Sequence, residues 1–222
     1  MKNKFLKSFA IILALMMMLM AFASCDMLNS NGGKEELGFH LLSDNTYGVM
    51  AGNTTYTENI VIPETHNGKA VTQILPKAFY EANNLKSITI PESVTSIGSY
   101  AFCDCNTLTS VTIPDSVTSI GGGAFYECSS LTSVTIPDSV TSIGSYAFEW
   151  CSSLTRVTIP DSVTSIGVQA FEYCSNLTSV EFKNTEGWKA GSTAISSTDL
   201  ANTSKAATYL NSTYYYLIWT RS

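Results

Sequence analysis

The sequence predicts a repeat solenoid that is mainly β, with one short helical or 3-10 turn in each 23-residue coil and irregular caps at both ends. The phrase TIPDSVTSIG occurs three times without a change, at Thr112–Gly121, Thr135–Gly144 and Thr158–Gly167. Leucines recur every 23 residues, at Leu85, Leu108, Leu131, Leu154 and Leu177. Self-similarity at one fixed period is typical of solenoids, in which each coil buries its apolar groups against the next.

One copy, Leu131–Ser153, shows how a coil begins. Val134 and Ile136 alternate with polar residues, which is the pattern of a strand with one buried face. The next residues, Pro137–Ser139, favour a turn, because proline fixes φ and cannot donate to a strand ladder, while aspartate accepts local hydrogen bonds.

The second half of this copy is expected to form another short strand and then a corner. Val140–Ile143 is a short extended piece, and we expect Gly144 to end it because glycine tolerates positive φ. Tyr146–Cys151 is too short to be a stable helix alone, so we expect one helical or 3-10 turn packed through Ala147 and Phe148.

The motif L-x-x-V-x-I-P, followed by S-V-T-S-I-G-x-x-A-F-x-x-C, resembles the BspA-like leucine-rich repeats of bacterial surface proteins. The resemblance covers about Ile60 to Val180. Members of that family are known mainly as surface proteins, and several are adhesins that bind host or neighbouring-cell components. The resemblance therefore implies a leucine-rich-repeat solenoid at the cell surface, with a protein or glycan ligand.

Residues 1–24 have the composition of a lipoprotein-type signal peptide. A basic start precedes the apolar run Phe9–Ala23, which is shorter than the roughly 20 residues that a membrane-spanning helix needs. Phe22–Cys25 resembles a bacterial lipobox, in which Cys25 would be lipidated and hold the protein at the membrane. The same stretch also fits ordinary signal cleavage after Ala23, which would give a secreted protein.

The other boundaries follow from composition and from where the repeated phrase starts and stops. Residues 25–37 are polar and contain glycine, as expected of a flexible tether. We expect an N-terminal cap at 38–59, the solenoid at 60–180 and a C-terminal cap at 181–222, because arrays need atypical ends.

The charge of the chain excludes one class of partner. Removal of the signal peptide would leave 9 basic residues (12 − 3) against 18 acidic ones, a net charge of about −9. Without a basic face to neutralise phosphates, nucleic acid is not an expected partner. Lipidated Cys25 is then the expected contact with the membrane.

Four cysteines recur at the repeat period, at Cys105, Cys128, Cys151 and Cys174. Stacked about 5 Å apart with parallel side chains, they are favoured as buried thiols over disulfides, and they lack the clustered spacing of zinc sites. Cys103 lies outside this column, where other copies have Tyr126, Glu149 or Glu172, and is expected to be an exposed free thiol.

Two polar columns have both an ordinary and a functional interpretation. Carboxylates recur in the Pro-Asp-Ser turns and suit either turn formation, which we favour, or Ca²⁺ binding; they are Glu92, Asp115, Asp138 and Asp161. The hydroxyls that flank each first strand resemble the threonine ladders of ice-binding solenoids. Arg156 and Glu181 interrupt this ladder, so an ordinary exposed strand face is favoured.

No enzyme is expected, and neither is a metal or cofactor. The two histidines, His40 and His66, are not near a nucleophile motif, and we expect both to be ordinary cap or loop residues.

Differences among the three later copies are concentrated at the corner and just after it. The corner could simply be solvated and free to drift. Alternatively, Tyr126, Tyr146, Trp150 and Tyr173 form an aromatic contact strip, because exposed tryptophan and tyrosine favour interfaces.

The sequence as a whole predicts an exported, lipid-anchored surface module that mediates adhesion or protein–protein interaction through repeated faces, which suit multivalent contact. A secreted form without the lipid is a variant of this prediction. The alternative is a structural scaffold of the cell envelope with no external ligand.

Overall fold

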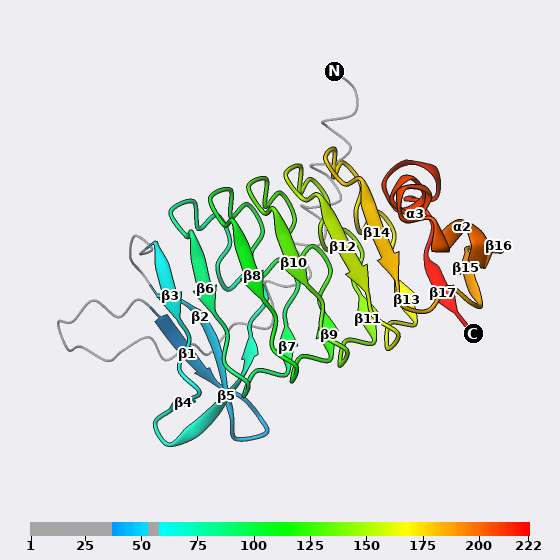
Figure 1. The fold of residues 1–222 in the computed structure, drawn as a ribbon. Coiled ribbons are helices and arrows are strands. Elements are labelled where there is room, and N and C mark those ends of the chain that lie inside the picture. The colour runs from blue at the N-terminus through cyan, green and yellow to red at the C-terminus, as the bar shows by residue number, and fades with distance from the viewer. Residues whose placement is uncertain (1–36, 53–57) are drawn as a thin grey trace. The chain divides into compact units, whose positions relative to one another are not determined.

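The computed structural model describes residues 37–52 and 58–222, all of which lie in one compact unit. They form a mainly β solenoid with little helix, so the predicted fold class is confirmed (Figure 1). The predicted signal peptide, most of the tether and the anchor residue Cys25 lie outside the described residues.

Strands run along two sides of the solenoid, one side formed by a single long sheet and the other by two shorter sheets, and a corner face of turns connects the two sides (Figure 1). The longer sheet has the order β1 (Leu37–Leu41), β2 (Tyr47–Ala51), β5 (Lys69–Ile74), β7 (Ser96–Ile97), β9 (Ser119–Ile120), β11 (Ser142–Ile143), β13 (Ser165–Ile166), β17 (Trp219–Arg221), β15 (Trp188–Ala190) and β16 (Thr193–Ala194), with β4 (Thr65–His66) also paired to β5. The other side contains β14 (Ser179–Phe182), β12 (Arg156–Ile159), β10 (Ser133–Thr135) and β8 (Ser110–Thr112) in one sheet, and β3 (Asn59–Val61) beside β6 (Ser87–Thr89) in another.

Residues one repeat apart pair with each other in these sheets. Ser133 pairs with Ser110 and Ser142 with Ser119, and both pairings are parallel. The repeat period is therefore the length of one coil, because each residue lies beside its equivalent in the next copy.

A ladder of phenylalanine rings fills the interior, with centroids 5.2–5.3 Å apart and planes within 10° of parallel. Its members are Phe79, Phe102, Phe125, Phe148 and Phe171. Burial of a large apolar side chain contributes roughly 1.5–3 kcal/mol, so this ladder stabilises the stack of coils along its length.

The periodic cysteines lie beside this ladder as buried free thiols, as predicted. Each thiol donates a hydrogen bond to a phenylalanine carbonyl of the preceding coil, for example Cys128 Sγ to Phe102 O at 3.0 Å. The prediction for Cys103 was wrong, because its side chain is buried. Burial, followed by the neighbouring Asp104 carboxylate, raises the pKa of this thiol.

The glycines that end each phrase have a different role from the one predicted. Gly144 does not have positive φ. A Cβ at this position would lie 2.5 Å from Gly122 N of the preceding coil, and Gly98, Gly121 and Gly167 show the same close approach. Glycine is required here because any side chain would meet the backbone of the coil before it.

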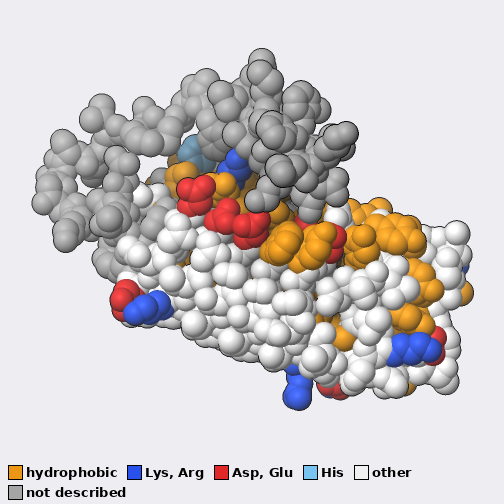
Figure 2. Space-filling model, turned by 90° about the horizontal axis from the view of Figure 1, so that it is seen from above, with side chains coloured by type: hydrophobic (Ala, Val, Ile, Leu, Met, Phe, Trp, Pro, Cys, Tyr) orange, Lys and Arg blue, Asp and Glu red, His pale blue; other side chains and the backbone are white. Residues whose placement is uncertain are grey.

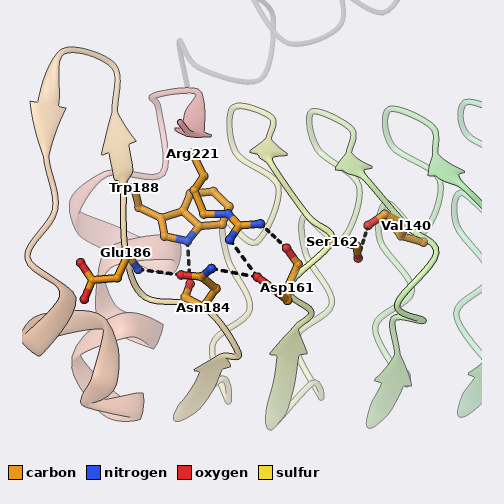
Figure 3. Close-up of polar contacts among 7 residues, drawn as sticks. All are labelled: Val140, Asp161, Ser162, Asn184, Glu186, Trp188 and Arg221. Carbon is orange, nitrogen blue, oxygen red and sulfur yellow. Dashed lines mark hydrogen bonds and ion pairs between the residues drawn. The ribbon is translucent and has the colours of Figure 1, made fainter.

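Hydroxyls of the repeated phrase also bind the preceding coil. Ser139 Oγ donates to Val117 O at 2.6 Å, and Ser162 Oγ donates to Val140 O at 2.7 Å (Figure 3). Thr141 Oγ1 donates more weakly to the equivalent threonine carbonyl, at 3.4 Å. The phrase repeats without change because most of its residues contact the copy before it.

The C-terminal end departs from the repeat. After β15 and β16 the chain forms α2 (Ser197–Ala201), α3 (Thr203–Thr208) and a π-helix (Tyr209–Thr213), and α2 and α3 pack beside β14 (Figure 1). The chain then returns as β17 to pair antiparallel with β13.

A polar clasp holds β17 to the last repeated turn (Figure 3). Arg221 Nη1 and Asn184 Nδ2 both donate to Asp161 Oδ1 at 2.9 Å, and Arg221 Nη2 donates to the Asp161 carbonyl. Trp188 Nε1 donates to Asn184 O at 2.9 Å, and the guanidinium lies 5.9 Å from the Trp188 ring. Asp161, one of the carboxylates that recur in the Pro-Asp-Ser turns, therefore has a structural role.

We expect Gly144→Ala to destabilise the protein by about 1–3 kcal/mol, because the added methyl group would overlap backbone that cannot move without separating two coils. The matched control is Gly122→Ala, whose Cβ would meet only Ser145 O at 3.3 Å and which should cost far less. Urea unfolding of both variants measures the difference, and equal loss would contradict this role for the glycine column.

The clasp predicts a pH-dependent contribution from Asp161. Hydrogen bonds from Asn184 and then Arg221 lower the pKa of this carboxyl group. Its stabilising effect should be complete above the unfolded-state pKa of about 3.9 and should disappear as the pH falls through the lower folded value. Asp161→Asn should therefore lower the Tm by a few degrees at most at pH 7, and the gap should close in acid.

Asp138→Asn, one coil earlier in the same column, is the control for this experiment. Thermal scans of both variants between pH 2 and pH 7 measure the effect. A gap for Asp161→Asn that persists at pH 2 would contradict the charged clasp.

Candidate functional site

The corner face is built from turns in which two residues of each coil adopt left-handed backbone conformations. In one coil these are Tyr146 (φ 62°) and Trp150 (φ 64°). Tyr146 N and Trp150 N donate to Val168 O and Glu172 O of the next coil at 2.9 Å, whereas Glu149 N closes a turn on Tyr146 O at 3.1 Å. The predicted corner thus has 3-10-type bonds, but they do not form a continuous helix.

The left-handed residues form two columns along the face. One contains Lys77, Tyr100, Gly123, Tyr146 and Gln169, and the other contains Glu81, Asp104, Glu127, Trp150 and Tyr173. An L-residue pays roughly 1–2 kcal/mol for this conformation, which glycine avoids. Only one of the ten positions is glycine, so the corner retains side chains at a conformational cost.

The structure brings two members of the predicted strip together. Trp150 and Tyr173 are 38% and 41% exposed, and their rings stack with centroids 4.1 Å apart and planes 21° from parallel. Tyr146 lies in the other left-handed column and is half-buried. Tyr126 lies between the columns, half-buried, where burial and then the carboxylates of Glu149 and Glu127 raise its pKa.

The acidic part of this face was not predicted from the sequence, because the prediction rested on aromatic residues alone. Glu81, Asp104 and Glu127 occupy the same column as the stacked pair, one in each of the three preceding coils. Glu149 and Glu172 are also on the corner but are 3% and 5% exposed, and Glu172 accepts a hydrogen bond from Gln169. Acidic and hydrophobic side chains are seen along this face in Figure 2. The same 23-residue offset that relates the leucines would have found this column.

The single glycine of the left-handed columns, Gly123, lies against the ring of Tyr100. A Cβ at Gly123 would lie 2.4 Å from Cε1 of the Tyr100 ring, so the ring occupies the space that a side chain at this position would need. Exchange of the glycine would displace the aromatic ring rather than the backbone.

The two histidines considered as candidate functional residues lie on strands, His66 on β4 and His40 on β1. His66 stacks on Phe39 with centroids 4.0 Å apart, and Tyr47 packs edge-on against it. His40 is exposed on β1. Within residues 37–52 and 58–222, no group of three or more histidine, cysteine or acidic side chains is placed to hold a metal ion. No helix in this part of the chain is long and apolar enough to cross a membrane.

Comparison with known proteins agrees with this architecture. Six copies of the BspA type leucine rich repeat region match residues 72–201. A leucine rich repeat protein of T. pallidum is 32% identical, with 67% of this chain and 70% of that chain covered and a TM-score of 0.64. One from Bacteroides ovatus is 30% identical, with a TM-score of 0.57, and the match covers 71% of this chain but only 40% of that one.

The pneumococcal vaccine antigen PcpA shares the fold alone, at 19% identity, 72% and 51% coverage and a TM-score of 0.55. None of the curated proteins matches the sequence. Proteins with such repeats are typically binding modules rather than enzymes. The repeat match extends over more than half of the sequence, and the chain therefore belongs to the BspA type leucine-rich repeat family.

Proposed function

We propose that the protein is an exported, lipid-anchored surface module that mediates adhesion or protein–protein interaction through its corner face. Family membership supports a cell-surface binding role, and repeated coils extend one surface along the array. Anchoring would come from lipidation of Cys25, with residues 25–37 as the tether.

The observation that supports the corner over the two sheet faces is the choice of residues at its left-handed positions. If the residue type at these positions varied freely without a functional role, glycine and asparagine would be favoured because they adopt this conformation most easily. Instead the columns hold a tryptophan and three tyrosines, and no asparagine. A contact function would offset the conformational cost of keeping Trp150 and Tyr173 there.

We expect the double variant Trp150→Ala, Tyr173→Ala to weaken adhesion of cells that display the protein by about tenfold or more, as for aromatic anchors at other interfaces. The control, Ser133→Ala with Thr135→Ala, changes exposed residues of β10 and should adhere normally. Circular dichroism checks that both variants fold.

Protease treatment of intact cells provides the second part of this test. Cleavage that abolishes adhesion would support an outward-facing binding module. Protection of the solenoid until the cells are permeabilised would contradict it and favour the envelope scaffold, and unchanged adhesion of the double variant would contradict the corner as the contact surface.

A count of thiols distinguishes the two fates of Cys25. The chain has six cysteines, and the five described ones are buried free thiols. In guanidinium chloride, a thiol reagent should titrate five groups if Cys25 is lipidated, because its sulfur is then a thioether. Six reactive thiols in the exported protein would contradict lipidation, while the five buried thiols should resist the reagent in the native state.

A further inference from the structure

We propose that the corner face binds a basic, arginine-containing polypeptide segment, with a guanidinium group stacked on the Trp150–Tyr173 pair and neighbouring positive charges beside Glu127 and Asp104. This inference rests on the proposed function of the corner as a contact surface and adds the chemistry of the partner.

The aromatic pair offers a surface for a flat cation. The two rings stack on each other, and each is more than one third exposed, so a ligand can reach the exposed part of the pair. Guanidinium is planar, weakly hydrated and attracted to the face of an aromatic ring, and tryptophan is the best of these rings. Trp150 is also the one tryptophan at the surface, since Trp188 and Trp219 are 2% and 1% exposed.

The carboxylates beside the aromatic pair favour a ligand that carries positive charge. Glu81, Asp104 and Glu127 lead along the left-handed column to Trp150, at the 5.2–5.3 Å interval of successive coils. Glu149 and Glu172 are buried beneath the corner, so its surface carries these three carboxylates and one lysine, Lys77. Such a face repels anionic partners and attracts cationic ones.

The corner already contains one cation–π contact of this kind, since Lys77 Nζ lies 5.8 Å from the centre of the Tyr80 ring. A neutral sugar could stack on an aromatic ring but would gain little from the carboxylates. An arginine-containing segment would use both features of the column, so the combination favours a basic polypeptide over a neutral glycan.

Tryptophan fluorescence and calorimetry of the complete protein test this proposal. Octa-arginine should give a saturable change in fluorescence because Trp150 is the surface tryptophan, and its affinity should fall as salt is added. Octa-lysine should bind several-fold more weakly because its compact ammonium groups cannot stack, and octa-glutamate should not bind. A neutral hexasaccharide that binds while octa-arginine does not would overturn the proposal.

Variants then locate the site by calorimetry, which does not depend on the fluorescent residue. Trp150→Ala with Tyr173→Ala should weaken octa-arginine binding by about tenfold, and Asp104→Asn with Glu127→Gln by about threefold. Asp115→Asn with Asp138→Asn removes the same charge from the turn column and should leave the affinity unchanged. Equal loss in the two charge pairs would overturn the site, since net charge alone would explain the binding.

The outcomes separate this proposal from the one on which it rests. If no cationic peptide binds but the corner double variant still loses adhesion, the partner chemistry is wrong and the corner remains the contact surface. If neither peptide binding nor adhesion depends on the corner, both are wrong.

Discussion

The whole fold depends on how closely the backbone of each coil approaches the backbone of the coil before it. The phenylalanine rings repeat at 5.2–5.3 Å, near the usual spacing between strands, and backbone hydrogen bonds join successive coils through both sheets and the corner. At this separation the position that ends each phrase has room only for hydrogen, which is why glycine stands there. Small hydroxyl side chains such as Ser139 can reach the neighbouring carbonyl, so most of the phrase is committed to joining coils.

These contacts between coils determine which positions on the surface can vary. The apolar residues of the phrase face the interior, and Ser139, Thr141 and Gly144 contact the preceding coil, so a change at one of these positions disturbs two copies. At the corner, backbone hydrogen bonds join each coil to the next, and the side chains of the left-handed residues differ in chemical type from coil to coil. The same architecture can therefore present carboxylates in its earlier coils and the Trp150–Tyr173 pair in its later ones without altering the core.

Much of this arrangement could be predicted from the sequence, because the period, the strands, the turns and the thiol column each depend on a residue type at a fixed offset. The corner conformation could not, since nine of its ten left-handed positions lack glycine and depend on hydrogen bonds to the next coil. Gly144 was recognised as special for the wrong physical reason, because backbone approach between copies is invisible in one copy. Cys103 was misplaced because its polar equivalents suggested exposure, although Glu149 and Glu172 are buried too.

The hydrogen bonds of the corner also give the array a direction. Each corner donates N–H groups to carbonyls of the following coil, and in the last coil Gln169 N finds its acceptor at Tyr215, outside the repeats. A coil placed between two others would inherit a donor on one side and an acceptor on the other, whereas a coil added beyond the end would not. In-frame tandem duplication within the gene could therefore lengthen the exposed surface step by step, while the sequence that closes the end stays unchanged.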